Sequence, residues 1–379
     1  MDTRMAWLPN RHRRTRAISQ PLSGTGPVVF HRSLPGYTRT PLVELPNVAE
    51  ALNLGTVLVK DESSRLGLPA FKMLGASWAT ARALAAHYGA RRPADLTALQ
   101  ELVRAHPAVR LVTATDGNHG RALARMAALL GLPATVVVPR NVSAAAIRLI
   151  RDEGCQVDVL DASYDDAVQH AAQMTQADDT ALLVQDTSWP GYETVPEWIV
   201  DGYATLFDEA ARQAGELRVT VQTVLVPVGV GSLAHAAVKS AAMVPGGLVP
   251  EVVAVEPDVA DCVRQSLAQG RLRTITTGET RMAGLNCGTP SYLAWPELRD
   301  GLAGAVAVDD AAAALAAKEL AVHGVDSGPC GAASLAALRL LATNPSARLD
   351  LGLDESSVIM LINTEGARAE ILWTDEGDG

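Results

Sequence analysis

Aromatic residues, cysteines and positive charge are what this sequence has least of. Aromatics make up only 4% of the 379 residues, so the core must be built from Ala, Val and Leu. Lys and Arg number 32 against 42 Asp and Glu, which gives a formal net charge of −10. Binding to a nucleic-acid backbone needs a positive field, so we expect no nucleic-acid partner.

The 4 cysteines lack the paired spacing of a disulfide framework or a zinc site. We therefore predict no metal centre and a reducing, cytoplasmic location. Cys262 and Cys287 lie in segments that flank the site suggested below. A bridge between these two thiols is possible, and geometry has to decide it.

Long apolar runs and targeting signals are also missing. No apolar stretch reaches the roughly 18–20 residues that a membrane-spanning helix needs, so we expect no membrane segment. The basic cluster at 11–16 is not followed by the apolar stretch of a secretory signal. We expect a disordered arm there, with an organelle transit peptide or an anion-binding arm as alternatives.

What the chain does have is a regular alternation of short apolar strands and Ala-rich helices. Its 48% hydrophobic and 20% charged residues are typical of a globular protein, and its 379 residues predict about two domains. We expect strands at 56–60, 110–114, 134–139, 156–160, 223–227, 252–256 and 358–362, and helices at 74–87, 119–130, 144–153 and from about 164. Continuous β-branched runs between helices indicate parallel sheets, in which ligands bind beyond the carboxyl ends of the strands.

Lys72 stands at a predicted helix start among apolar residues. The positive end of a helix and an apolar surrounding both disfavour the charged ammonium, which makes the amine available for Schiff-base chemistry. Taken alone, Lys72 fits better as an ordinary lysine whose stem packs on the sheet while its head reaches water.

Two further loops carry polar groups. Asp116 and Asn118 lie between a strand and a helix, where Asp116 is a candidate acid or base and Asn118 can hydrogen-bond a planar ligand. We expect the neighbouring His119 to pack at the helix start. Asp186 precedes Trp189 in a second loop, and a partly desolvated carboxylate there would suit acid–base chemistry. Alone, each loop also reads as a capped or solvated turn.

A glycine-rich loop, Gly229-Val230-Gly231-Ser232, follows a predicted strand and opens an Ala-rich helix. Backbone N–H groups at such a helix start can bind an anion such as a phosphate. The loop is neither a Walker A sequence nor a complete GxGxxG. By itself it is weak evidence for a ligand and reads equally as a turn.

Together and in this order, these segments resemble the fold type II (tryptophan synthase β-like) pyridoxal-phosphate enzymes, and within that group the diaminopropionate ammonia-lyase family. The lysine-bearing and Asp-Gly-Asn-His-Gly segments are the more distinctive ones. The matching segments lie at 40–42, 60–72, 114–121, 185–193, 229–232, 282–288 and 364–366. The resemblance therefore spans nearly the whole chain.

The resemblance implies an α/β fold of two domains, with open, twisted parallel sheets and the cofactor in the cleft between the domains. The smaller domain would be inserted at 75–186. The larger would combine 1–74 with 187–379. The family also suggests a homodimer.

The resemblance also implies how the cofactor, pyridoxal 5′-phosphate, would be held. Lys72 would bind it as a Schiff base, and the loop at 229–232 would hold its phosphate through backbone N–H groups. Asn118 would hydrogen-bond the side of the ring hydroxyl. Thr364 would approach the pyridine nitrogen, and we hypothesise that a neutral hydroxyl there favours elimination.

In the family two aspartates act as acid–base groups, and the matching positions are Asp116 and Asp186. One on each side of the cofactor plane would allow attack on the α-proton of either enantiomer. An aspartate, or Lys72 after its release, would remove that proton from a small amino-acid substrate. With 2,3-diaminopropionate the β-amine would then leave, and the aminoacrylate would hydrolyse to pyruvate and ammonia.

Several positions depart from the family pattern and leave other reactions open. Ala367 and Arg368 follow Thr-Glu-Gly, where the family usually has an Asp-Thr type sequence. The alternatives are a serine/threonine dehydratase-like elimination and a β-replacement that makes a specialised amino acid. A non-enzymatic cofactor-binding protein is a third class, against which the intact Lys72, Asp116 and Asp186 argue.

Overall fold

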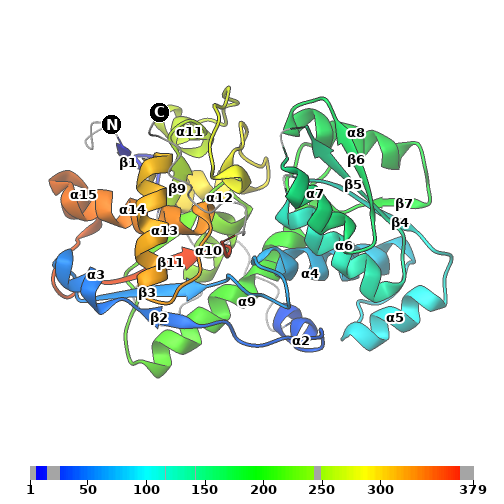
Figure 1. The fold of residues 1–379 in the computed structure, drawn as a ribbon, viewed down its shortest axis with the longest axis horizontal. Helices are drawn as coiled ribbons and strands as arrows, with labels where there is room; N and C mark the ends of the chain where they lie inside the picture. The colour runs from blue at the N-terminus through cyan, green and yellow to red at the C-terminus, as the bar shows by residue number, and fades with distance from the viewer. Residues whose placement is uncertain (1–5, 15–25, 116, 141, 243–248, 368–379) are drawn as a thin grey trace. The chain divides into compact units, whose positions relative to one another are not determined.

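Two compact units make up the chain (Figure 1). The computed structural model describes residues 6–14, 26–115, 117–140, 142–242 and 249–367. The first unit combines Met1–Leu22, Arg39–Phe71 and Leu206–Gly379, and the second combines Ser23–Thr38 and Lys72–Thr205. The segment at 75–186 lies within the second unit, which extends beyond it on both sides.

The first unit is built on a seven-stranded sheet in the order β1-β10-β9-β8-β11-β3-β2. The central strands run parallel, as the apolar runs predict, while the edge strands β1 and β2 pair antiparallel with their neighbours. The strands are β1 (Trp7–Pro9), β2 (Leu42–Glu44), β3 (Thr56–Asp61), β8 (Thr223–Pro227), β9 (Glu251–Pro257), β10 (Gly304–Val308) and β11 (Val358–Asn363).

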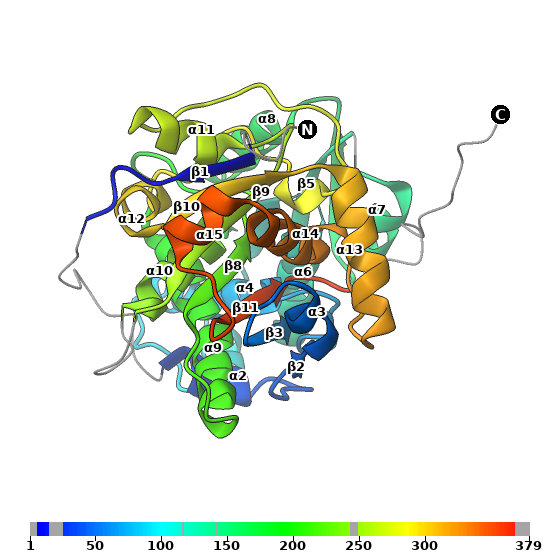
Figure 2. The ribbon, with the colours of Figure 1, turned by 90° about the vertical axis from the view of Figure 1, so that its left-hand side faces the viewer.

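Helices cover both faces of this sheet (Figure 2). Alternate side chains such as Val57, Leu225 and Ile359 pack with α14 in the main core cluster. Val224 and Met360 point to the opposite face, toward α9 and α10. The helices of this unit outside α9 are α3 (Pro46–Ala51), α10 (Ser232–Ala241), α11 (Cys262–Gln269), η1 (Ala283–Leu285), α12 (Ala294–Gly301), α13 (Asp310–Val322), α14 (Pro329–Thr343) and α15 (Pro345–Leu351).

The second unit contains a four-stranded parallel sheet in the order β6-β5-β4-β7. Its strands are β4 (Arg110–Ala114), β5 (Ala134–Pro139), β6 (Gln156–Leu160) and β7 (Ala181–Leu183). Its helices are α2 (Gly26–Arg32), α4 (Lys72–His87), α5 (Leu96–Arg104), α6 (Asn118–Leu130), α7 (Ala144–Arg151) and α8 (Tyr164–Gln176), and α9 (Thr194–Glu216) begins here. The predicted strands and helices are thus confirmed to within a few residues.

The N-terminal segment is ordered over residues 6–14, so the prediction of a disordered arm is wrong there. β1 adds an antiparallel strand to the edge of the sheet beside β10. Asn10 Nδ2 donates to Arg299 O at 2.7 Å and to Leu302 O at 2.9 Å, and Arg13 pairs with Glu251. Edge pairing satisfies the exposed main chain of β10, which basic composition alone does not reveal. The remainder of the predicted arm, at 15–16, lies outside the described residues.

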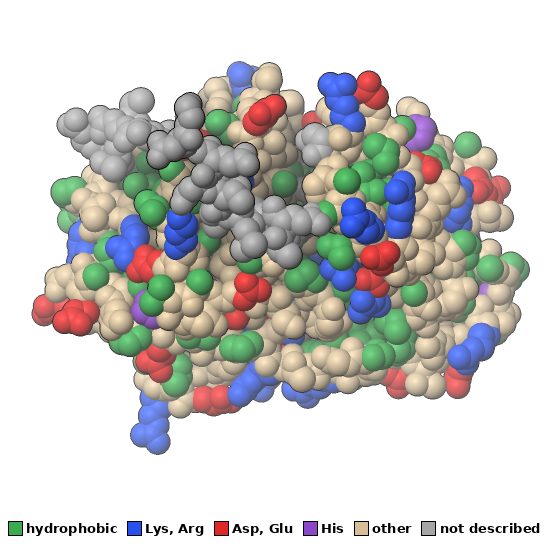
Figure 3. All heavy atoms as spheres, viewed as in Figure 1, with side chains coloured by type: hydrophobic (Ala, Val, Ile, Leu, Met, Phe, Trp, Pro, Cys, Tyr) green, Lys and Arg blue, Asp and Glu red, His purple; other side chains and the backbone are tan. Residues whose placement is uncertain are grey.

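Charges on the molecular surface are mixed. The face in Figure 3 carries acidic and basic side chains interspersed among neutral ones. Among the described residues, no helix combines the length and the apolar character needed to cross a membrane.

Candidate active site

Lys72 and Asp186 are in direct contact in the second unit. Lys72 is the first residue of α4, and Asp186 follows β7. Lys72 Nζ donates to Asp186 Oδ2 at 2.6 Å, although the two residues are 114 positions apart in the sequence. The fold therefore brings together two of the three residues that the sequence proposes for catalysis.

Two glycines bring Tyr203 of α9 beside Lys72. A Cβ on Gly75 would lie 2.5 Å from Tyr203 Cε1, and one on Gly202 would lie 2.5 Å from Leu74 O. Only glycine therefore allows α4 and the beginning of α9 to approach this closely. Burial raises the pKa of the Tyr203 phenol, and the neighbouring Lys72 opposes that rise. Sequence reasoning missed Tyr203, which no motif marks.

Asp186 is held as a carboxylate by its neighbours. Burial alone would raise its pKa, but His119 and Lys72 outweigh burial and lower the pKa to about 2. Gln185 fixes the same loop, because its Oε1 accepts hydrogen bonds from Ala114 N and Thr113 Oγ1 at 2.9 Å each. Asp186 is therefore a buried anion beside a cation, a common feature of acid–base sites.

His119 does more than fill space at the helix start. It is buried, as its expected packing role requires, and its Nε2 donates to Val184 O at 2.8 Å. Its Nδ1 lies 3.8 Å from Asp186 Oδ2. Burial lowers the pKa of His119, Asp186 raises it, and Lys72 lowers it. The pairing of β4 with β7 explains the contact, since His119 and Asp186 both follow the carboxyl ends of these neighbouring strands.

The structure describes only some of the other residues of the Asp-Gly-Asn-His-Gly segment. Asp116, the second predicted acid–base group, lies outside the described residues. Asn118 begins α6 and is half-buried. A Cβ on Gly120 would lie 2.4 Å from Thr115 Cγ2, so this glycine lets α6 lie close against the preceding strand end.

The glycine loop lies in the first unit, at the carboxyl end of β8, and leads into α10 at Ser232. Gly231 has a φ of +97°, and a Cβ there would lie 2.6 Å from Leu298 Cδ1. A Cβ on Gly229 would lie 2.9 Å from Gly284 O. Val230 O accepts a hydrogen bond from Ser291 N at 2.8 Å, which fixes the loop. Both glycines are thus required by the shape of the loop, and α10 supplies a helix N-terminus suited to a phosphate.

Thr364 follows β11, which pairs with β8 in the same sheet. Its Oγ1 is buried and has no hydrogen-bond partner among the described residues. A buried hydroxyl without a partner is costly, so this atom indicates a place for a ligand acceptor or donor. The unpartnered hydroxyl and the glycine loop of the first unit are groups that suit a phosphate-bearing aromatic ligand, and the amine of Lys72 in the second unit is a group that can form a Schiff base.

A buried network holds the residue before Thr364. Asn363 Nδ2 donates to Asp61 Oδ1 and to Asp326 O, both at 2.8 Å. Ser327 Oγ donates to Asn363 Oδ1 at 2.7 Å. A Cβ on Gly331 would lie only 1.8 Å from Asn363 Oδ1, so α14 needs a glycine here. Sequence reasoning missed this network because its members lie in three separate segments.

The cysteines near the glycine loop are free thiols, so the possible bridge between Cys262 and Cys287 is absent. Cys262 Sγ donates to Gly229 O at 3.8 Å. Cys287 Sγ would lie 3.1 Å from a Cβ on Gly229. Burial raises the pKa of Cys262 well above its usual value. Both side chains therefore pack beneath the loop.

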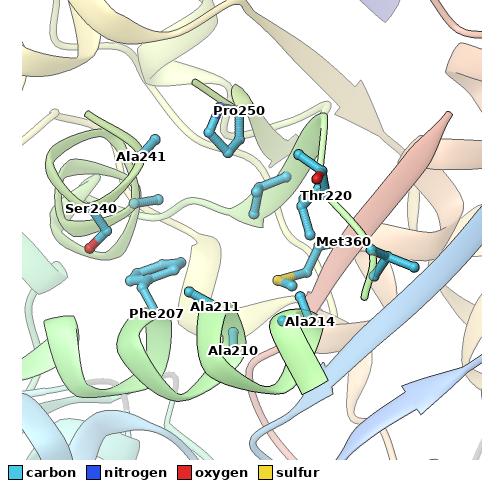
Figure 4. Close-up of a pocket in the computed structure, with 14 residues that line it drawn as sticks. Phe207, Ala210, Ala211, Ala214, Thr220, Ser240, Ala241, Pro250 and Met360 are labelled. Carbon is cyan, nitrogen blue, oxygen red and sulfur yellow. The ribbon is translucent and has the colours of Figure 1, made fainter. Parts of the chain in front are cut away.

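A separate hollow of about 210 Å³ lies in the first unit (Figure 4). Its walls are mostly apolar and include Phe207 and Ala210 of α9, Ser240 of α10 and Met360 of β11. None of the predicted site residues lines it.

Comparisons with known proteins agree with this arrangement. The family model described as "Pyridoxal-phosphate dependent enzyme" matches residues 34–365. The diaminopropionate ammonia-lyase of Salmonella typhimurium is 37% identical over 371 residues, covering 92% of this chain and 90% of the relative. The crystal structure of the Escherichia coli diaminopropionate ammonia-lyase in complex with D-serine matches with a TM-score of 0.87 and 33% identity, covering 95% and 93% of the two chains.

A second Escherichia coli structure extends the comparison to the chemistry. It is described as a complex of that enzyme with an aminoacrylate–PLP azomethine reaction intermediate, and it matches with a TM-score of 0.83 and 33% identity, covering 95% of this chain and 93% of that one. The fold type II class expected from the sequence is confirmed, and pyridoxal 5′-phosphate is the cofactor of this class. The chain belongs to the pyridoxal-phosphate-dependent enzymes and, within them, to the diaminopropionate ammonia-lyase family.

Proposed function

We propose that this protein catalyses the α,β-elimination of 2,3-diaminopropionate to pyruvate and ammonia. The contact between Lys72 and Asp186 is the observation that carries the proposal. It places a nucleophilic amine and an ionised carboxylate together, as proton removal next to a bound amino acid requires. Bound pyridoxal phosphate would supply the electron sink that makes the α-proton acidic.

Lys72 controls the basicity of Asp186 in this scheme. The Lys72 ammonium helps to lower the pKa of Asp186. After Lys72 has been released as a neutral amine, that influence is absent and the Asp186 carboxylate is a stronger base. Proton removal by Asp186 is thus coupled to the state of Lys72. A free Lys72 amine can in turn hold or return a proton at its Nζ.

The remaining predicted residues bind and orient. We propose that Gly229, Val230, Gly231 and Ser232 hold the phosphate, and that Asn118 and Thr364 hydrogen-bond the ring. Asp116 would be the second acid–base group. A carboxylate also suits a substrate with a second cationic amine, which it can bind and protonate on departure.

The setting of the enzyme follows from the same family membership. We propose a homodimer in the cytoplasm that acts on a small amino acid without a nucleic-acid partner. Free, buried cysteines such as Cys262 are compatible with a reducing compartment.

A second candidate is elimination from serine. The Escherichia coli relative has been crystallised in complex with D-serine, which favours a site that accepts a β-hydroxy amino acid. Serine would lose water instead of the β-amine and give the same keto acid. The carboxylates of Asp116 and Asp186 suit the diamino substrate better, because they can pair with its second ammonium.

A panel of amino acids tests the proposal. The purified holoenzyme is incubated with each enantiomer of 2,3-diaminopropionate, serine and threonine, with and without an added nucleophile such as a thiol. Release of pyruvate fastest from diaminopropionate, without dependence on the nucleophile, supports the proposal. Product formation only with the nucleophile would identify a β-replacement enzyme. If the cofactor is bound but no amino acid of the panel gives a product, the proposal is overturned.

A further inference from the structure

His119 has a ring nitrogen whose environment its packing role does not explain. The side chain is buried in the second unit, and its Nε2 donates to Val184 O. That bond fixes the ring, because a carbonyl can only accept and the proton must therefore be on Nε2. Nδ1 is buried and has no hydrogen-bond partner among the described residues.

Among the ion pairs of the described residues, this ring has one acidic partner. Asp186 Oδ2 lies 3.8 Å from its Nδ1. An unprotonated Nδ1 and an ionised carboxylate both present lone pairs, so the contact becomes attractive only when one of them holds a proton. A small movement would then close the gap to a charge-assisted hydrogen bond. The geometry is therefore that of a proton shared between an imidazole and a carboxylate.

We propose that His119 is a positioning residue that shares the proton of Asp186 during turnover. The proton that the Asp186 carboxylate takes from the substrate passes to His119 Nδ1, breaking the O–H bond and forming an N–H bond with the Nδ1 lone pair. It returns by the reverse step. The inference rests on the proposed function, in which Asp186 is an acid–base group.

The other titratable groups around the pair come from two helices and one loop. Lys72 of α4 lowers the pKa of both His119 and Asp186. The Tyr203 phenol is buried and the Tyr192 side chain is half-buried near Asp186. Burial raises the pKa of both phenols, and the Asp186 carboxylate adds to the rise. Lys72 is the only cation among these neighbours. When the Lys72 amine is neutral, His119 is a described group beside Asp186 that can take up a proton and hold it as a cation.

His119→Gln tests the proposal, because glutamine retains a donor for Val184 O but cannot hold the proton. We expect the variant to bind the cofactor, to lose about tenfold or more in kcat, and to show a shifted pH profile. His31→Gln is the matched control. His31 is a buried histidine of the same unit whose ring bonds Thr205 Oγ1 at 2.8 Å and Leu74 O at 2.9 Å. It should leave the shape of the profile unchanged.

A substrate-free measurement separates this inference from the proposed function. In protein labelled with ¹⁵N at its histidine rings, one ring should show a proton fixed on Nε2, and Asp186→Asn should lower its pKa because the carboxylate that raises it is gone. His119→Asn identifies the signal if the glutamine variant does not fold. The inference would be overturned if the pKa reported by the Nδ1 signal were the same in Asp186→Asn as in the wild type. A folded His119→Gln enzyme with the wild-type pH profile would also overturn it. A coupled titration without pyruvate release would overturn only the proposed function.

Discussion

Lys72 Nζ donates a hydrogen bond to Asp186 Oδ2 at 2.6 Å. The lysine begins a helix and the aspartate lies in the loop that follows a strand, so their contact depends on the second unit being folded. Each partner changes the chemistry of the other. The carboxylate stabilises the ammonium. Together with His119, the ammonium holds the pKa of the carboxyl low, and its share of this effect ends when the amine is neutral.

Replacing Lys72 should abolish cofactor attachment without unfolding the protein. Lys72 begins α4 and its side chain is partly exposed, so Lys72→Ala removes little packing. We expect the purified variant to lack the visible absorbance band of a lysine-bound cofactor and to have no measurable turnover, while its circular dichroism is unchanged. Lys318→Ala on α13, an exposed lysine, is the control and should retain the band. A yellow, active Lys72→Ala enzyme would contradict the assignment.

The Asp186 carboxylate should make stability depend on acidic pH. Its pKa is lowered from the usual 3.8 to about 2. A lowered folded-state pKa contributes stability that is present above pH ~4 and lost as the pH falls toward ~2. In cofactor-free protein, urea titrations should show Asp186→Asn less stable by about 2 kcal/mol near pH 6, with the gap closing at low pH. The exposed Asp179→Asn should show no such gap, and a constant gap for Asp186→Asn would contradict the prediction.

Removing the Thr364 hydroxyl should affect the cofactor more than the fold. Oγ1 is buried without a partner among the described residues. Thr364→Val deletes an unsatisfied group at nearly equal volume, so the cofactor-free protein should be as stable or up to about 1 kcal/mol more stable. Cofactor affinity should fall about tenfold, equivalent to ~1.4 kcal/mol.

Thr364→Ser is the matched variant, since it keeps the hydroxyl and should keep the affinity. Equilibrium titration with pyridoxal phosphate measures both variants. Equal affinity in Thr364→Val and the wild type would show that the Thr364 hydroxyl does not contribute to cofactor binding.

Two helical glycines should respond in opposite directions to the same substitution. Gly331→Ala in α14 places a Cβ 1.8 Å from Asn363 Oδ1 and breaks the network before Thr364. We expect a loss of at least about 1–3 kcal/mol, as in overpacked cores, together with weaker cofactor binding. Gly215→Ala in α9 meets no atom within 4 Å and should gain about 0.5–1 kcal/mol from helix propensity. Thermal unfolding of both variants measures the contrast, and equal shifts would contradict it.

Most of the fold follows from the sequence because its central strands are continuous apolar runs. β5 and β8 are buried along their whole length, which produces the pattern that predicts parallel sheets. β10 was not predicted, because its Gly-Ala-Val-Ala-Val composition also suits a helix or a loop. β1 and β7 have only 3 residues each, too few to show a period.

The candidate site is predictable only where a local motif marks it. Lys72 and the glycine loop stand in distinctive segments directly at helix starts. Tyr203 and Asn363 are placed by contacts with residues far away in the sequence, so no local sequence pattern predicts their role. His119 was predicted as a packing residue because only the pairing of β4 with β7 reveals that its ring faces Asp186.

The ratio of ammonia to pyruvate tests the central claim most directly. The holoenzyme is incubated with 2,3-diaminopropionate, and both products are quantified over time, with Lys72→Ala as the blank. Elimination of the β-amine followed by hydrolysis releases two molecules of ammonia for each pyruvate, and the account predicts this ratio from the first turnovers. Bound cofactor with no pyruvate, or ammonia formed without pyruvate in this ratio, would contradict the account.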